Sequence, residues 1–263
     1  MSAGKVGWAT RVAAIAVLAF LAVPILIIFP LALSPSEYLT FPPQGLSLRW
    51  LETVLDSADW RSSIWLSFQI AVGSTLLAVA LSVLAALALV RGRFRFKQLV
   101  YALILLPMIV PNIISAIAMF FFFADSAAAF GSTVAIIIGH AVVALPIAVI
   151  ILSATLQGVD GRLENAALSL GAGRYTAFRR ITLPLIAPGI ASACIFAFLS
   201  SFDELLIAMF MAGSTAQTLP VRIWNSVLFQ LDPTIAAVSA LLVVVSVIAL
   251  LAANLLARRG AKA

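Results

Sequence analysis

The sequence contains very little charge for its length. Of its 263 residues only 10% are charged, whereas 63% are hydrophobic, and the mean hydropathy is +1.17. A soluble domain usually carries about a quarter charged residues, so this chain cannot present an ordinary water-facing surface. The scarcity of charge excludes a soluble globular protein and predicts that a lipid bilayer is its solvent.

Residues that build most catalytic and metal sites are also scarce. The single histidine, His140, and the single cysteine, Cys194, cannot form a disulfide framework, a zinc cluster or a Cys–His nucleophile pair. The phosphate-binding pattern GxxxxGK[ST] is missing, because the one Gly-Lys pair is followed by Val6. We therefore expect that the chain is not an enzyme and binds no cofactor. A hydrogen-bonded packing role is expected for His140, with a ligand role left open.

Six apolar runs are long enough to cross a bilayer, for which a helix needs about 20 residues. They are residues 12–33, 62–90, 98–124, 126–159, 181–202 and 233–257. The fourth run is longer than one helix requires, so we place its span near 133–156. Prolines inside the first, third and fourth runs are compatible with kinked membrane helices. These runs predict an all-α, polytopic membrane protein with six transmembrane helices.

The positions of the basic residues predict the orientation. With a cytoplasmic N-terminus, 13 of the 16 Lys and Arg residues fall on the cytoplasmic side, and only Arg49, Arg61 and Arg222 fall outside. We therefore predict that both termini are cytoplasmic. The net charge of +6 does not indicate a nucleic-acid partner, because the basic residues form short blocks between apolar runs.

One long cytoplasmic segment, residues 157–184, stands apart from the other loops. Asp160 is suited to cap a helix, and Gly171 is suited to end it. Between them, four apolar residues share one helical face: Leu163, Ala166, Ala167 and Leu170. A second stretch follows with Tyr175, Phe178, Ile181 and Leu185 at helical spacing. The pattern predicts a helix–turn–helix elbow that projects into the cytoplasm, although an amphipathic loop on the membrane surface explains the residues equally well.

The elbow also carries a motif with fixed spacing. The pattern Asn165-Ala166-Ala167-x3-Gly171-x9-Ile181-x-Leu183-Pro184 resembles the EAA signature of ABC importer permeases, E-A-A-x3-G-x9-I-x-L-P. Every spaced element matches except the first, because Asn165 stands where the family has Glu. The resemblance implies a type I importer fold with a coupling helix that docks on an ATPase. The implied coupling residues are Glu164, Asn165, Ala166, Ala167, Leu170, Gly171, Ile181, Leu183 and Pro184.

The resemblance extends over residues 62–257, which would form the permease core after an N-terminal segment, 1–61, and before a basic tail, 258–263. Stretches at 201–204, 218–224 and 232–239 are similar to the spermidine/putrescine-type branch. The resemblance implies a bacterial inner-membrane location and a polyamine-like solute. It also implies three partners, namely a second permease subunit, an external solute-binding protein and a dimer of ATPase subunits that holds ATP and Mg²⁺.

Four polar residues within the predicted spans are candidates for the solute path. Asp203 and Glu204 follow the fifth apolar run, whose apolar character then resumes to Met211, so we expect them inside the fifth span, where a charged residue costs about 2.5–3.5 kcal/mol. We predict that they line the path, with Asp203 as the better candidate, although a kinked helix with the pair in water stays open. Asn112 and Ser115 follow Pro111 in the third predicted span and are further candidates, with helix–helix contact as an equal alternative.

An alternative function is an ion-coupled secondary transporter or channel that works without an ATPase. Such folds often contain inverted repeats and intramembrane residues that couple to ions. The sequence shows no repeat, and only Asp203 and Glu204 are suited to couple to an ion. Transport driven by an ion gradient alone would favour this alternative.

Overall fold

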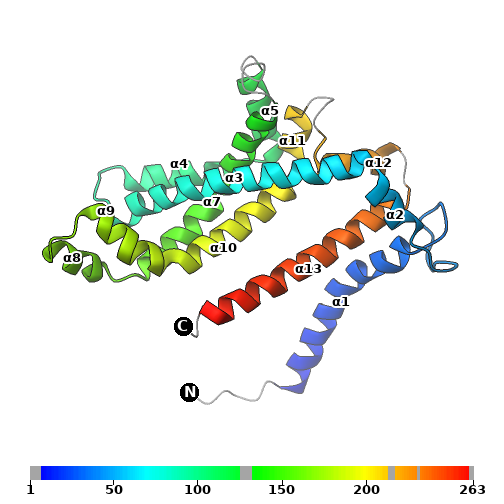
Figure 1. Ribbon diagram of the computed structural model, residues 1–263, viewed down its shortest axis with the longest axis horizontal. Helices are drawn as coiled ribbons and strands as arrows, with labels where there is room; N and C mark the ends of the chain where they lie inside the picture. The colour runs from blue at the N-terminus through cyan, green and yellow to red at the C-terminus, as the bar shows by residue number, and fades with distance from the viewer. Residues whose placement is uncertain (1–6, 125–131, 213–216, 230–231, 261–263) are drawn as a thin grey trace. The chain divides into compact units, whose positions relative to one another are not determined.

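A computed structural model describes residues 7–124, 132–212, 217–229 and 232–260, with side chains up to residue 248. Within these ranges every regular element is a helix (Figure 1). The chain divides into two compact units: unit 1 comprises residues 1–61 and 223–263, and unit 2 comprises residues 62–222. The two units are described separately.

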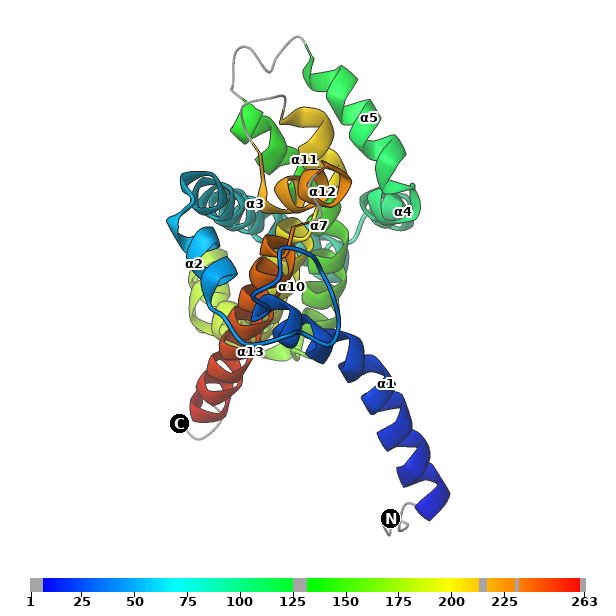
Figure 2. The ribbon, with the colours of Figure 1, turned by 90° about the vertical axis from the view of Figure 1, so that its right-hand side faces the viewer.

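The helices that lie wholly in unit 1 are α1 (Trp8–Ala32), α2 (Arg49–Asp56) and α13 (Thr234–Gly260). α3 (Ala58–Arg91) and α12 (Leu219–Phe229) cross the boundary between the units. α13 packs against both α1 and α2, and Figure 2 shows α1 and α13 meeting beside the loop that follows α1. Apolar side chains of α1 are exposed on every face of the helix from Trp8 to Leu26. A helix that is hydrophobic all round and yet exposed is suited to contact lipid.

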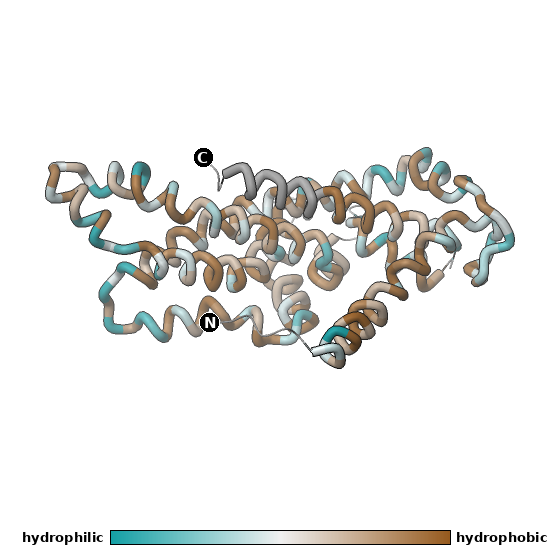
Figure 3. Tube along the Cα trace, turned by 90° about the horizontal axis from the view of Figure 1, so that it is seen from below, coloured by the Kyte–Doolittle hydropathy of each residue, from teal (hydrophilic) through white to brown (hydrophobic). Residues whose placement is uncertain are grey.

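Unit 2 is built around three long helices, α3 (Ala58–Arg91), α7 (Ser132–Gln157) and α10 (Leu183–Phe202). Their shared core consists mainly of alanines: Ala78, Ala86, Ala141, Ala144, Ala148, Ala193 and Ala197. Small residues allow helix backbones to approach closely where no water drives association. Hydrophobic residues run along the long helices, and hydrophilic residues gather at their ends and connections (Figure 3).

Two serines of α3 join that helix to α7. Each hydroxyl donates mainly within α3, Ser74 to the Ile70 carbonyl at 2.7 Å and Ser82 to the Ala78 carbonyl at 2.6 Å. Each also lies close to a carbonyl of α7, Ser74 to that of Ile137 at 3.1 Å and Ser82 to that of Leu145 at 3.4 Å. Hydrogen bonds between helices are a common means of holding membrane bundles together. At the other end of unit 2, the first residue of α12 (Leu219–Phe229) donates its N–H to Ser67 at 2.7 Å.

The predicted all-α membrane fold is confirmed, but the count of six spans fits only roughly. Within the described ranges, four helices are long and apolar enough to cross a membrane: α1, α3, α7 and the continuous helix Arg174–Phe202. The third predicted span is α4 (Lys97–Ile109) followed by α5 (Asn112–Phe123). If that pair is one span the number is five. The sixth predicted run, 233–257, coincides with α13, whose side chains are described only over Thr234–Ile248, an apolar stretch too short to be counted by itself.

The third predicted span is bent far more sharply than a proline kink, because α4 and α5 meet at an angle of 102°. Val110 ends α4 in an extended conformation, with φ −72° and ψ 134°. Steric conflict with a following proline disfavours the helical conformation of the preceding residue, and Pro111 has no N–H with which to continue the helix. The Val110-Pro111 pair therefore breaks the span instead of bending it slightly.

Of the two arrangements expected for Asp203 and Glu204, the structure has the interrupted helix. α10 ends at Phe202 with Asp203 as its C-cap, and α11 (Leu206–Met211) begins three residues later. The Glu204 carboxylate accepts hydrogen bonds from the N–H groups of Ile207 and Ala208, at 2.8 and 3.4 Å. It thereby satisfies donors that a helix start leaves unpaired, so the charged pair marks a helix break.

Candidate functional site

The elbow consists of α8 (Gly161–Ser169), a turn, and α9 (Arg174–Ala177), which continues through a π-helical turn, η1 (Phe178–Thr182), into α10. Asp160 caps the start of α8, as expected, by accepting the Arg162 N–H at 2.9 Å. The elbow therefore stands directly on one of the long helices of unit 2. The π-helical turn η1 lies just before the start of α10. Pro184, at that start, cannot donate a helical hydrogen bond.

Gly171 ends α8, as expected, in a left-handed conformation with φ +87°. The N–H of Gly171 donates to the Leu168 carbonyl and that of Ala172 donates to the Ala167 carbonyl, both at 3.0 Å. This pair of bonds is a Schellman motif, which requires a residue tolerant of positive φ. The glycine of the spaced motif is therefore explained by backbone geometry.

The outer face of α8 presents apolar side chains. Leu163 is 48% exposed and Leu170 is 89% exposed, and Ala166 between them is exposed as well. Asn165, the residue at the motif's first position, is also exposed, whereas Ala167 is half-buried. Contiguous exposed apolar residues on a polar segment are characteristic of protein–protein or membrane contacts. We call Leu163, Ala166 and Leu170 the elbow stripe.

Glu164 lies on the inner side of α8 and braces the elbow against α3. Its Oε1 lies 3.3 Å from Arg91 Nη2 and accepts the Thr182 hydroxyl at 2.9 Å. Arg91 Nη2 also donates to the Val159 carbonyl at 2.8 Å. The two charged side chains are only 29% and 22% exposed, so solvent screens the pair less than a surface ion pair. Three elements, α3, α8 and η1, are thereby joined at one carboxylate.

The remaining predicted coupling residues lie at the base of the elbow. Ile181 belongs to η1, and Leu183 and Pro184 begin α10. Ile181 and Leu183 are half-buried, whereas Pro184 is exposed. The motif thus unites one outward-facing surface on α8 with residues that attach the elbow to α10.

A hollow of about 530 Å³ opens between α5, α7, α10 and the break that follows α10. Three of the four predicted path residues line it, namely Asn112, Asp203 and Glu204, together with apolar residues such as Phe196. Ser115 is not among its lining residues and is half-buried in the first turn of α5. We call this space the acidic hollow.

The two carboxylates of the acidic hollow have different surroundings. Asp203 is exposed, whereas Glu204 is only 7% exposed. Glu204 Oε2 accepts the two α11 N–H groups and lies 3.6 Å from His140 Nε2. His140 Nδ1 in turn lies 2.9 Å from the Ser201 hydroxyl. Glu204 is therefore held in place by protein groups, and Asp203 is the carboxylate that a solute reaches more readily.

Sequence reasoning missed two parts of these sites. Arg91 was noted only for its charge, and nothing in the sequence links it to Glu164, which is 73 positions away. The approach of His140 to Glu204 has no sequence signal either. His140 itself is buried and hydrogen-bonded, as expected of a packing residue.

Comparison with known proteins identifies the family. A family model described as "Binding-protein-dependent transport system inner membrane component" matches residues 78–262. The chain belongs to this family. It is accordingly an inner-membrane permease subunit of an ABC importer, a transport component and not a catalytic enzyme, which confirms the resemblance seen in the motif.

Several relatives of this permease are similar over most of its length. It is 29% identical to the spermidine/putrescine transport system permease protein PotC of Escherichia coli K12, over 92% of this chain and 91% of the relative. It is 32% identical to the putrescine transport system permease protein PotI of the same strain, over 91% and 87%. It is 34% identical to the molybdenum transport system permease protein ModB of Mycobacterium bovis, over 73% and 77%.

A solved structure shares the fold of the permease. It is that of a bacterial ABC transporter involved in the import of the acidic polysaccharide alginate. The two chains superpose with a TM-score of 0.68 at 17% identity, over 97% of this chain and 98% of the other. At this identity the likeness establishes the fold alone.

Proposed function

We propose that this permease forms the path for a small cationic solute that bears amino groups, and that residues 160–184 couple the path to a separate ATPase. The observation that carries the coupling proposal is the elbow stripe, whose Leu170 is 89% exposed on a rigidly capped helix. An apolar surface held in this way gains free energy only when a partner covers it. The ATPase is the partner that a permease of this family requires.

The brace beneath the stripe supports a role in transmission. A displacement of α8 would be transmitted by the Glu164 carboxylate to its two partners. One is Arg91 at the end of α3, and the other is Thr182 at the start of α10. Both long helices belong to the core of unit 2. Closure of the ATPase subunits on ATP would therefore tilt α3 and α10, and α10 borders the acidic hollow, which would then face alternately outward and inward.

The proposed solute follows from the charge of the hollow and from two relatives. Asp203 and Glu204 give the hollow two carboxylates and Asn112 gives it an amide oxygen, which are groups that attract and accept hydrogen bonds from ammonium groups. Relatives named for spermidine and putrescine support a polyamine-like solute. Because another relative is named for molybdenum, the family alone does not fix the solute.

The proposed assembly contains three further kinds of subunit. A second, distinct permease would complete the path, two ATPase subunits would bind ATP and Mg²⁺, and an external binding protein would deliver the solute. Both termini would lie in the cytoplasm, because this orientation places the elbow and 13 of the 16 basic residues on the cytoplasmic side.

Co-purification tests the coupling proposal. The full chain would be isolated from its native membrane in mild detergent, alongside the double variant Leu163→Glu, Leu170→Glu and the control Arg162→Gln. Both substituted leucines are exposed, so the fold does not depend on them, and Arg162 is an exposed residue of the same helix outside the stripe. An ATPase subunit is expected with the native chain and the control and is expected to be lost from the double variant.

The opposite result would favour the ion-coupled alternative. If no ATPase accompanies the native chain, and if uptake in vesicles follows an ion gradient without ATP, the permease works as a secondary transporter. Retention of the ATPase by the double variant would instead remove the stripe from the docking site while leaving the importer function intact.

A further inference from the structure

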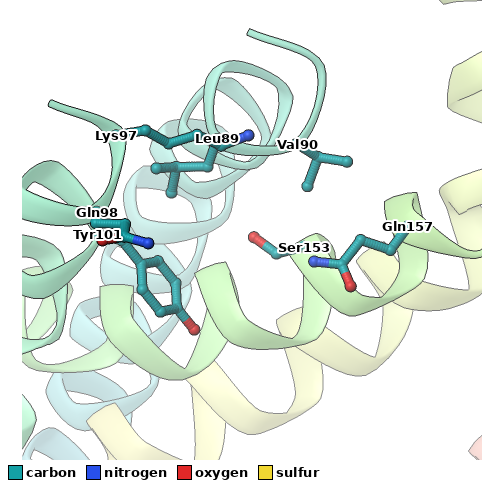
Figure 4. Close-up of a pocket in the computed structure, with 7 residues that line it drawn as sticks. All are labelled: Leu89, Val90, Lys97, Gln98, Tyr101, Ser153 and Gln157. Atoms are coloured by element: carbon teal, nitrogen blue, oxygen red, sulfur yellow. The ribbon is translucent and has the colours of Figure 1, made fainter. Parts of the chain in front are cut away.

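A second hollow in unit 2 lies where α3, α4 and α7 come together, and it differs in charge from the acidic hollow. Its volume is about 420 Å³. Leu89 and Val90 at the end of α3 form its apolar wall, and residues of α4 and α7 supply its polar groups (Figure 4). The hollow is near the elbow, because Arg91, the next residue of α3, donates to the Val159 carbonyl.

One buried hydroxyl in this hollow lacks a partner in the protein. Ser153 of α7 is 7% exposed and its Oγ makes no hydrogen bond to the described residues. Figure 4 shows this hydroxyl directed into the space between α7 and α4, which the side-chain amides of Gln98 and Gln157 also face. A buried polar group without a partner costs free energy, so the arrangement points to a ligand that accepts a hydrogen bond.

The charge of the hollow selects an anion. Lys97 is the one ionised residue among those that line it, and its Nζ lies 3.5 Å from the Gly92 carbonyl. Lys97 also begins α4, whose first turn has no side-chain cap and therefore carries the partial positive charge of a helix start. With the Tyr101 and Ser153 hydroxyls and two amides, the lining offers many donors and no carboxylate. A polyamine would be repelled here.

We propose that this hollow binds the phosphate of an anionic phospholipid. Lys97, Ser153 and Gln157 contact the phosphate oxygens, and Leu89 and Val90 contact the apolar part of the same molecule. A lipid fits better than a small free anion because the polar groups adjoin an apolar wall on helices that cross the membrane. In the orientation proposed above, the hollow opens to the cytoplasmic leaflet, where basic pockets between helices attract anionic head groups.

Lipid titration of the purified transporter tests this proposal. The full chain, together with the subunits that accompany it, would be stripped of lipid in a neutral detergent and titrated separately with phosphatidylglycerol, phosphatidylcholine and inorganic phosphate. Native mass spectrometry would count the molecules retained. The variants are Lys97→Gln and Ser153→Ala, and the control is Arg95→Gln, an exposed basic residue of the same connection outside the lining.

The expected result is one phosphatidylglycerol retained in preference to phosphatidylcholine. Its affinity should fall about fivefold in Lys97→Gln, the effect of one basic group near an anionic lipid, with a smaller loss in Ser153→Ala and none in the control. Equal retention of phosphatidylcholine, or an equal loss in Arg95→Gln, would overturn the proposal. Displacement of the lipid by millimolar inorganic phosphate would show a free-anion site instead. An unchanged thermal unfolding curve for Ser153→Ala would show that this variant is folded, so that its loss of binding is due to the missing hydroxyl.

Discussion

Glu164 of α8 and Arg91 of α3 form an ion pair with a separation of 3.3 Å, and the Thr182 hydroxyl donates to the same carboxylate oxygen. The residues are 73 positions apart in the chain, so the pair joins the elbow to a long helix that the motif does not contain. The family resemblance marks this region as a docking surface. The contacts of Glu164 with Arg91 and Thr182 show that α8 also has an inward face, which holds the elbow against α3 and η1.

Breaking this pair should uncouple transport from ATP hydrolysis while leaving ATPase docking intact. In Glu164→Gln the charge is lost but the outer stripe is unchanged, so the ATPase should co-purify and the solute moved per ATP should fall several-fold. Because the pair is partly exposed, its contribution to stability should be about 1 kcal/mol or less. Uptake and ATP hydrolysis, both measured in proteoliposomes, give this ratio, the amount of solute moved per ATP hydrolysed.

The charge-swapped variant Glu164→Arg, Arg91→Glu serves as the rescue, and Arg93→Gln, an exposed neighbour, serves as the control. Recovery of the ratio in the swapped variant supports the brace. If Glu164→Gln instead releases the ATPase, the residue contacts the partner directly and the brace is not its main role.

Gly171 and Gly173 should respond differently to the same substitution. At φ +87° an alanine at position 171 is strained, with a cost of about 1–2 kcal/mol for a left-handed residue with a Cβ. Gly173 has an ordinary φ of −71° and open space where a Cβ would stand. Gly171→Ala should therefore speed hydrogen exchange of the amides in α8, and Gly173→Ala should leave it nearly unchanged. Equal effects would contradict the role of the Schellman motif.

Gly189 of α10 should be the most sensitive glycine of the helix core. A Cβ at this position would collide with the side chain of Thr155 on α7, and overpacking of this kind typically costs 1–3 kcal/mol. Gly189→Ala should lower the unfolding temperature of the purified protein, and the added change Thr155→Gly, which also removes the Cβ that lies 2.7 Å from the new methyl group, should restore part of it. A double variant no better than the single one would show that the two helices are spaced by other contacts.

Substitutions of the two acidic residues after α10 should affect different properties, uptake for Asp203 and stability for Glu204. Asp203→Asn removes an exposed charge, so uptake of labelled putrescine should fall with little change in unfolding. Glu204→Ala removes the groups that accept the N–H bonds of Ile207 and Ala208, and the loss of a helix cap costs about 1 kcal/mol. Its unfolding temperature should therefore drop. Unchanged putrescine uptake in Asp203→Asn would exclude this residue from the solute path.

Features that depend on neighbouring residues could be predicted from the sequence. The cap at Asp160 and the stop at Gly171 follow from local backbone needs, and both are where the sequence places them. The apolar runs likewise locate the long helices, because the bilayer selects length and composition. Composition alone left open whether the elbow docks on a protein or lies on the membrane surface. The family resemblance is what implied docking.

Features that depend on distant partners or on a break in regular structure were not predictable. An apolar run shows where a helix is allowed, but it does not show where the helix stops. Pro111 and the charged pair indicate distorted helices without placing the breaks at Val110 and Asp203. The Arg91 contact and the His140 contact join residues more than 60 positions apart, and no local pattern records them.

The bend at Val110-Pro111 has a consequence for how the protein sits in its solvent. A helix start leaves several N–H groups without helical partners, and α5 begins there with no side-chain cap. Hydrocarbon has no acceptor for such groups, so unravelled backbone at membrane depth persists only beside protein or water. Asn112, the first residue of α5, lines the acidic hollow. The bend is therefore stable only where the hollow or its surroundings supply acceptors, from water or from protein, for these backbone groups.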